Sequence, residues 1–458
     1  MTIRPLAPAA MAAPAESARR WAFAFTPRLV LLLAAGLVVL VPAWIDDRAA
    51  FGLALWNLLV FLLWVVDARR LPAPGDLQLH RRWPGPLAIG RRAAVDLAIE
   101  NRSHTFVHAW LTDHLPGALR RELTEVEIAA PGGATASAQY FVDPRERGDL
   151  PVSILAIRYR TAWGLAERWA VAPLEQQVRV YPDLHEARHH SMYLVRSRQV
   201  AIEKRRARAT GLGRDFESLR DYRQGDEIRD ICWSATSRRA KLVTRVYQPE
   251  RSQAVWIIVD GGRLLRARVG RQTKLDCMVN AALALAEVAL TAGDRVALLT
   301  YGRRVHQRIA PDRGPRHLRR IVEALATVPA QPVEADHAGA AASVLANQKQ
   351  RALIVWLTDL AETAGIPDVI ESASGMSPRH AVVFAIMGQP EMTALGAAVP
   401  ETLSDSYRML AAQETLERRD GLLRGLRHRG VMALEVNPGD LTPALVDQYL
   451  RVKERNLV

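Results

Sequence analysis

Two long apolar stretches follow each other near the N-terminus of the chain. Residues 29–45 and 49–66 contain no charged residue, and each stretch is about as long as the shortest helix that crosses a bilayer. Only an Asp-Asp-Arg triplet at positions 46–48 separates them. No small-residue cleavage site follows the first stretch, and a soluble core helix usually keeps a polar face. The pattern therefore predicts a transmembrane helical hairpin over residues 29–66.

Arginines flank both apolar stretches. Three precede the first stretch and four follow the second: Arg19, Arg20, Arg28, Arg69, Arg70, Arg81 and Arg82. Because positive charge next to a membrane helix marks the cytoplasmic side, we expect both termini and all soluble domains in the cytoplasm. Residues 1–28 are rich in Ala and Pro, which predicts a disordered N-terminal tail.

Residues 76–182 change to an alternation of period two. In one run, Val95, Leu97 and Ile99 alternate with small or polar residues. Further short runs of this kind lie at residues 107–112, 135–142, 152–160 and 168–172. Turn-forming residues separate these runs, so the segment predicts an antiparallel β-sandwich of immunoglobulin-like type.

Residues 183–253 are basic. Between positions 188 and 208 there are seven Lys or Arg residues and one Glu, which is typical of a solvated linker, although contact with anionic lipid is an alternative. The formal net charge of the whole chain is +13. Nucleic-acid binding is disfavoured as its cause, because no DNA- or RNA-binding motif is present. The only cysteines, Cys232 and Cys277, agree with a reducing compartment and are interpreted as ordinary core residues.

Residues 254–458 alternate between apolar strands and helices, which predicts a mostly parallel, doubly wound sheet. Asp260 and Asp359 each end an apolar strand, and Asp336 lies in the loop before the second of these strands. Ligands of such sheets bind beyond the carboxyl ends of the strands, and three carboxylates there could hold Mg²⁺ or Ca²⁺. The alternative is that each Asp caps a helix or a turn.

The order of these elements resembles a von Willebrand factor A domain. Such domains bind a divalent cation through an Asp-x-Ser-x-Ser motif, a Thr and a second Asp. Here Asp260 is present, but Gly262 and Leu264 stand where the serines belong; Asp336 occupies the region of the Thr, and Asp359 is retained. The resemblance therefore implies an A-like domain with a degenerate cation site.

A denser resemblance lies upstream, in residues 213–238. This stretch contains Phe, then Leu-Arg-x-Tyr-x-x-Gly-Asp, then Arg-x-Ile-x-Trp and then Ala-x-x-Arg, and it resembles the signature of the family called domain of unknown function 58. The signature positions are Phe216, Arg220, Tyr222, Gly225, Asp226, Arg229, Trp233 and Arg238. Paired charges and aromatic residues predict either a structural clasp against the α/β sheet or a surface that recognises a partner protein.

These observations favour a non-enzymatic protein, since the sequence has no nucleophile elbow, metalloprotease motif or phosphate-binding loop. The family resemblance implies a bacterial cytoplasmic-membrane protein that works with a MoxR-type AAA+ ATPase on membrane or envelope proteins. A cation-dependent ligand-binding protein that uses the three aspartates stays open as an alternative. A module that binds nucleic acid or anionic lipid is a third, less favoured interpretation.

Overall fold

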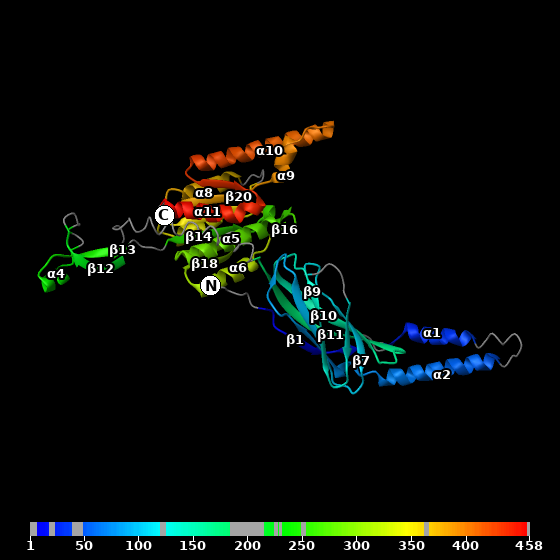
Figure 1. Cartoon of the computed structure of the whole chain (residues 1–458). Helices are drawn as coiled ribbons and strands as arrows, with labels where there is room; N and C mark the ends of the chain where they lie inside the picture. The colour runs from blue at the N-terminus through cyan, green and yellow to red at the C-terminus, as the bar shows by residue number, and fades with distance from the viewer. Residues whose placement is uncertain are drawn as a thin grey trace. The chain divides into compact units, whose positions relative to one another are not determined.

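The chain divides into two compact units, and the boundary between them in the sequence falls between residues 181 and 182. The structure is a computed structural model, and Figure 1 shows the elements of both units. It describes residues 7–17, 23–38, 49–119, 125–183, 215–223, 228, 231–248, 253–360 and 366–455.

Short strands in two sheets form most of the first unit. One sheet has the order β1-β4-β6-β9, and the other has the order β2-β11-β10-β7-β8, with β3 and β5 also paired to β11. All pairs are antiparallel except β5, which runs parallel to β11. The strands are β1 (Met11–Pro14), β2 (Glu16–Ser17), β3 (Phe23–Phe25), β4 (Leu77–Arg82), β5 (Leu87–Ala88), β6 (Ala93–Asn101), β7 (Val107–Asp113), β8 (Glu125–Ala130), β9 (Thr135–Val142), β10 (Gly148–Arg160) and β11 (Ala166–Tyr181).

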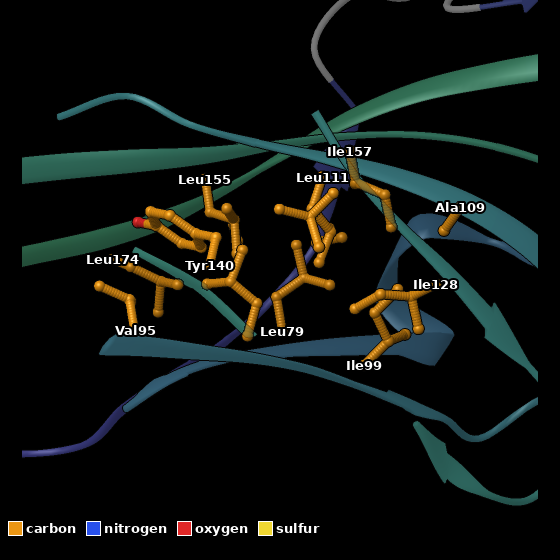
Figure 2. Close-up of a cluster of buried hydrophobic side chains, with 14 of the residues drawn as sticks. Leu79, Val95, Ile99, Ala109, Leu111, Ile128, Tyr140, Leu155, Ile157 and Leu174 are labelled. Carbon is orange, nitrogen blue, oxygen red and sulfur yellow. The ribbon is translucent and has the colours of Figure 1, made fainter. Parts of the chain in front are cut away.

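The two sheets share one hydrophobic core. Val95, Leu97 and Ile99 of β6 are fully buried, so the predicted alternation on this strand is confirmed. Figure 2 shows side chains of this sheet facing those of the other, which include Leu111 and Leu155. Burying such a side chain stabilises the fold by about 1.5–3 kcal/mol, and alternate positions are left for polar residues.

An ion pair inside this core joins the two sheets. Arg81 of β4 and Asp113 of β7 are both buried, and the Arg81 Nε donates a hydrogen bond of 3.0 Å to Asp113 Oδ2. The hydroxyl of Tyr140 donates to the same carboxylate. The sequence analysis counted Arg81 among the charges that flank the membrane. That assignment is wrong, because Arg81 has a buried partner and is closed off from lipid; Arg69 and Arg70 remain exposed.

The N-terminal segment forms strands where the sequence predicts a disordered tail. Residues 11–14 pair with β4, and residues 23–25 pair with β11. Without these partners, β4 and β11 would be edge strands with unpaired backbone groups. Pairing with these sheet edges therefore orders the segment, although its Ala- and Pro-rich composition is typical of disorder.

Helices α1 (Pro27–Ala35) and α2 (Ala49–Arg70) occupy the predicted hairpin region. Among the described residues, α2 is the single helix long and apolar enough to cross a membrane, and only 11% of its apolar window is buried. The indole N–H of Trp56 on α2 donates to the Leu32 carbonyl of α1 at 2.8 Å, so the two helices pack together. The first predicted spanning helix is described only as far as Val38, and the turn at 46–48 lies outside the described residues.

Both helices are fixed to residues 161–166, which are the connection between β10 and β11 and the first residue of β11. Asp67, in the last turn of α2, is fully buried. It accepts hydrogen bonds of 2.8 Å from two backbone N–H groups of this connection and a third from the Thr161 hydroxyl. Thr26, which caps α1, donates to the Gly164 carbonyl at 2.7 Å. The start of α1 and the end of α2 therefore meet at one place on the sheet.

The second unit begins, in its described part, with a hairpin formed by the signature segment. Strands β12 (Asp215–Asp221) and β13 (Val243–Gln248) pair antiparallel, and the short helix α4 (Trp233–Arg239) lies between them in sequence. The basic run at 188–208 lies outside the described residues.

A six-stranded sheet forms the centre of this unit, with the order β18-β17-β14-β19-β20-β21. All neighbours are parallel except β18, which is antiparallel to β17. In chain order this is third-second-first-fourth-fifth-sixth, as in doubly wound folds, and it confirms the prediction of a mostly parallel α/β sheet. Its strands are β14 (Ala254–Asp260), β17 (Arg295–Tyr301), β18 (Val305–Asp312), β19 (Leu353–Thr358), β20 (Ala381–Met387) and β21 (Met432–Val436), and a separate small pair is β15 (Arg268–Val269) and β16 (Gln272–Thr273).

Helices cover both faces of the central sheet. Helices α7, α8 and α10 pack on one face in a shared core with β14, β19 and β20, while α5 and α11 contact each other and strands of the sheet. The helices that follow α4 in this unit are α5 (Lys274–Thr291), α6 (Pro315–Ala326), α7 (His337–Asn347), α8 (Ile366–Met376), α9 (Pro390–Ala397), α10 (Leu403–His428) and α11 (Leu441–Glu454). Because the sheet is buried on both faces, its strands read as nearly continuous apolar runs.

Candidate functional site

Asp260 ends β14 at the point where the strand order reverses, the usual ligand position of such sheets. Its carboxylate is buried. One oxygen accepts a hydrogen bond of 2.7 Å from the Gly262 N–H, and the other accepts one of 2.6 Å from the hydroxyl of Thr358, the last residue of β19. Burial raises the pKa of Asp260, although the nearby His337 and these two hydrogen bonds act in the opposite direction. Asp260 thus connects the ends of two neighbouring strands.

Asp359, which follows β19, is held by two cationic side chains. The Lys274 ammonium lies 2.5 Å from Asp359 Oδ2, and Arg419 Nη2 lies 3.0 Å from Asp359 Oδ1. Lys274 is the first residue of α5, and Arg419 belongs to α10. Arg419 also donates to Glu435 on β21 at 2.7 Å. These contacts form a buried ion network that joins two helices to the carboxyl edge of the sheet.

Asp336 has a different environment from the other two aspartates. It is exposed, and its Oδ1 accepts a hydrogen bond of 2.8 Å from the Gly339 N–H as the N-cap of α7. This is the capping role that the sequence analysis kept as an alternative. Among the described residues, no group of three or more His, Cys, Asp or Glu side chains is arranged to hold a metal ion.

The loop after β14 is tightly packed around Gly262. A Cβ atom at this position would lie 3.0 Å from both Asp260 Oδ1 and the Ala335 Cβ, closer than side chains normally pack. A serine here, as in the A-domain motif, would therefore require the loop to shift. The next position of that motif, Leu264, lies in a 3-10 helix (Arg263–Arg266).

A second polar cluster, made of Tyr301, His337 and Trp356, lies beside Asp260. The Tyr301 hydroxyl is 2.8 Å from His337 Nδ1 and accepts a hydrogen bond of 2.7 Å from the Trp356 indole. Burial raises the pKa of Tyr301 and lowers that of His337, and the charge of Asp260 opposes the second shift. The Tyr301 hydroxyl thus links His337 to Trp356 at the edge of the sheet.

The signature segment is anchored through its backbone. The Cys232 N–H donates to the Val243 carbonyl at 2.8 Å, and the Val243 N–H donates to the Thr236 hydroxyl at 3.1 Å. Of the signature positions, Arg220 and Tyr222 are half-buried. Trp233 and Arg238 are exposed, and the other four, which are the side chain of Phe216 and the residues Gly225, Asp226 and Arg229, lie outside the described part of the chain.

Among the described residues between the start of β12 and the end of β13, the exposed large apolar side chains are Ile228, Trp233 and Leu242. The Trp233 side chain is 63% exposed at the start of α4, and Arg238 is exposed at the end of the same helix. A structural clasp would enclose the indole, whereas a recognition surface requires it to be accessible. The geometry of α4 therefore favours the second interpretation of the signature.

Sequence reasoning did not find Lys274 and Arg419 as members of the site. Arg419 lies 60 residues from Asp359 along the chain, so no local pattern connects them. Lys274 did leave a signal, because it is a cation at the N-terminus of a helix, where the helix dipole favours acidic residues. Such a placement calls for a nearby carboxylate, and Asp359 supplies it.

Comparison with known proteins gives relatives whose functions are themselves undescribed. The chain is similar to Uncharacterized protein Rv1480 of Mycobacterium tuberculosis and to Uncharacterized protein Mb1516 of Mycobacterium bovis, each 26% identical over 151 residues. The match covers 32% of this chain and 48% of each relative, so it spans about half the length of these proteins.

Two solved structures resemble the chain at low similarity. BatB from Bacteroides thetaiotaomicron is 12% identical with a TM-score of 0.31, and the match covers 45% of this chain and 100% of BatB. Proximal thread matrix protein 1 from the mussel byssus is 12% identical with a TM-score of 0.30, over 43% of this chain and 47% of that protein. Scores below 0.5 do not identify a fold.

The match to a protein-family model is the most informative comparison. Residues 218–414 match the family described as "Protein of unknown function DUF58". This range begins inside β12 and contains α4, Lys274 and Asp359, and it ends within α10 before Arg419. Over this region, the chain is similar to the DUF58 family, as the signature in the sequence predicts.

Proposed function

We propose that this chain is a non-enzymatic, membrane-anchored interaction protein of the bacterial cytoplasmic membrane, which binds a MoxR-type AAA+ ATPase and directs it to membrane or envelope proteins. The observation that carries the proposal is α2, a 22-residue helix whose apolar surface is left uncovered by its own unit. An exposed apolar face of this size marks a membrane or protein contact. Its length matches the apolar thickness of a bilayer.

The charges at the end of α2 support a cytoplasmic position for the rest of the chain. Arg69 and Arg70 close the helix, and Arg28 lies near the start of α1. Since α1 and α2 are both bound to residues 161–166, a hairpin would place all three arginines at the same membrane face. The positive-inside rule assigns that face to the cytoplasm, where a cytosolic ATPase operates.

We also propose a more specific fold for each of the two units. Two sheets around one core support an immunoglobulin-like sandwich for the first unit. The strand order of the second unit, its antiparallel edge strand β18 and the aspartate that ends β14 support a von Willebrand factor A-like domain. Such a fold hosts many functions, so the partner has to be argued from the surface and not from the fold.

The exposed helix α4 is the best-supported contact for the ATPase. Trp and Arg are favoured at the centres of protein interfaces, where a few side chains provide most of the binding free energy. Trp233 and Arg238 provide both residue types on one short helix, next to the exposed Leu242. Because these signature residues are exposed, they are available to contact a partner protein.

A pull-down from detergent extract, with ATP and Mg²⁺ present, tests the proposal. The full chain should recover an AAA+ ATPase, and Trp233→Ala should lower the recovered amount by about 30-fold, the effect of losing a hot-spot residue. Trp169→Ala is the matched control, because this β11 residue is 53% exposed and lies outside the signature. Recovery of no AAA+ protein by the full chain, or equal losses in the two variants, would refute the proposal.

The cation-dependent alternative has less support. Both oxygens of Asp359 already contact cationic side chains, and Asp336 caps a helix. Calorimetry of the full chain in detergent with Mg²⁺, Mn²⁺ and Ca²⁺ separates the two functions. Saturable heat at one ion per chain would favour ligand binding through this site.

A further inference from the structure

Aromatic and basic side chains surround the place where α1 begins and α2 ends. We define this group as the collar, and its members are Phe25, Arg28, Arg69, Arg70 and Trp163. Phe25 is 69% exposed, Trp163 is 43% exposed, and the three arginines are exposed. We propose that the collar binds the headgroups of anionic phospholipids. This inference rests on the proposed function, in which α2 crosses the bilayer.

The collar residues are held together by contacts from three elements. The guanidinium of Arg70 on α2 lies 4.3 Å from the centre of the Trp163 ring. Arg28 on α1 donates a hydrogen bond of 3.3 Å to the Trp163 carbonyl. The Phe25 ring packs at 5.3 Å from the ring of Trp64 on α2. Trp163 is thus the common contact of the two helices, and Arg28 and Arg70 are held against it before any ligand binds.

The exposed charged side chains of this region are all positive. Residues 23–38, 64–70 and 159–166 meet here, and together they contain four arginines and one acidic residue. That residue is Asp67, which is buried and accepts three hydrogen bonds from the connection. Because this carboxylate is enclosed, the exposed arginines of these residues attract anions and do not neutralise each other.

The position beside α2 identifies the anion as a lipid headgroup. Trp is enriched at the headgroup level of membranes, where an amphipathic ring fits both layers. Arginine stays charged near lipid and binds phosphate with two parallel hydrogen bonds. The collar lies directly next to the uncovered apolar surface of α2, so a bilayer that surrounds the helix brings phosphates to it. Nucleic acid would have no access to this surface in a membrane-inserted chain.

Spin-labelled lipids measure this selectivity directly. The full chain is reconstituted in vesicles of phosphatidylcholine and phosphatidylglycerol in equal parts, and the association of each labelled lipid with the protein is compared by electron paramagnetic resonance. We expect a preference of about fivefold for phosphatidylglycerol, the effect of one basic residue near the surface. The variant Arg28→Gln/Arg69→Gln/Arg70→Gln should lose it.

The variant Arg82→Gln/Arg91→Gln/Arg92→Gln is the matched control. It removes the same charge from the same unit, at the ends of β4 and β6 that lie away from α2, and it should keep the preference. Equal lipid association in the full chain, or equal loss in both variants, overturns the collar proposal. Carbonate extraction of the vesicles is a separate test: a chain released by carbonate refutes the membrane anchor itself.

Discussion

Arg419 is the residue on which the candidate site depends most strongly, and the variant Arg419→Met tests that dependence. The guanidinium is 5% exposed and contacts the carboxylates of Asp359 and Glu435. It also donates to the carbonyls of Leu360, at 2.7 Å, and Met387. Methionine keeps much of the apolar volume of the side chain and removes all of these donors. The decrease in the free energy of unfolding therefore measures the contribution of the polar contacts.

The expected loss follows from the burial of the partners. Asp359 would keep Lys274 as its only cationic partner, and two buried carbonyls would each lose a donor. Removing one partner of a buried ion pair costs about 3–5 kcal/mol. For a domain of roughly 200 residues, each kcal/mol lowers the melting temperature by about 2–4 °C. Arg419→Met should therefore unfold the α/β unit about 6–20 °C below the unaltered chain.

The neighbouring residue provides a control with the same chemistry. The side chain of Arg418 is 56% exposed and pairs with Glu414 one turn earlier on the same helix. Replacing it by methionine should change the free energy of unfolding by less than about 0.5 kcal/mol, because exposed pairs are screened by solvent. Hydrogen–deuterium exchange of peptides from β19 and β20, on the full chain in detergent with increasing urea, reports this unit separately from the first one.

The reasoning would be refuted if Arg419→Met lost less than about 1 kcal/mol, or no more than Arg418→Met. Either result would mean that Asp359 is stabilised without the guanidinium, for example by water or by Lys274 alone. The ion network would then be an incidental contact. A loss confined to Arg419→Met would show that the carboxyl edge of the sheet is held together by side chains from α5 and α10.

Two other predictions concern buried charged or titratable groups of the α/β unit. Burial lowers the pKa of His380, and among the described contacts neither ring nitrogen has a hydrogen-bond partner; the neutral form is therefore favoured in the folded state. The contribution of neutral His380 to the free energy of unfolding should be fully present above the unfolded-state pKa of about 6.5 and should decrease as the pH drops below it. His380→Phe should therefore reduce the difference in unfolding free energy between pH 7.5 and 5.5. On α11, the buried Lys453 ammonium lies 2.6 Å from Asp294, so Lys453→Met should cost about 3–5 kcal/mol and increase hydrogen exchange in α11; unchanged exchange would contradict the pairing.

Regular apolar patterns predicted the sheets because they reflect burial directly. The alternation at Val95, Leu97 and Ile99 reports one buried face, and the apolar runs that end at Asp260 and Asp359 report strands covered on both faces. These signals are local and depend on the side chains alone. They were sufficient to predict the α/β organisation and the antiparallel sheets from the sequence.

Features that depend on distant partners were not predictable in this way. Arg81 sits in a basic stretch near α2, and only the fold shows that Asp113 and Tyr140 enclose it. Residues 11–14 have a composition typical of disorder, but they are ordered by the free edge of β4. Asp67 looks like a single charge near the end of an apolar helix, and its three donors come from residues almost 100 positions later.

The ion network changes how the proposed A-like domain would be controlled. A divalent cation is taken from solution, so a site built on it responds to ion concentration. Lys274 and Arg419 are part of the chain, so Asp359 has these two partners at any ion concentration. Gly262 fits the same scheme, because a serine at this position would require the loop around Asp260 to shift. Control of partner binding would then have to act elsewhere, and the exposed helix α4 and the proposed membrane anchor α2 are the features that could provide it.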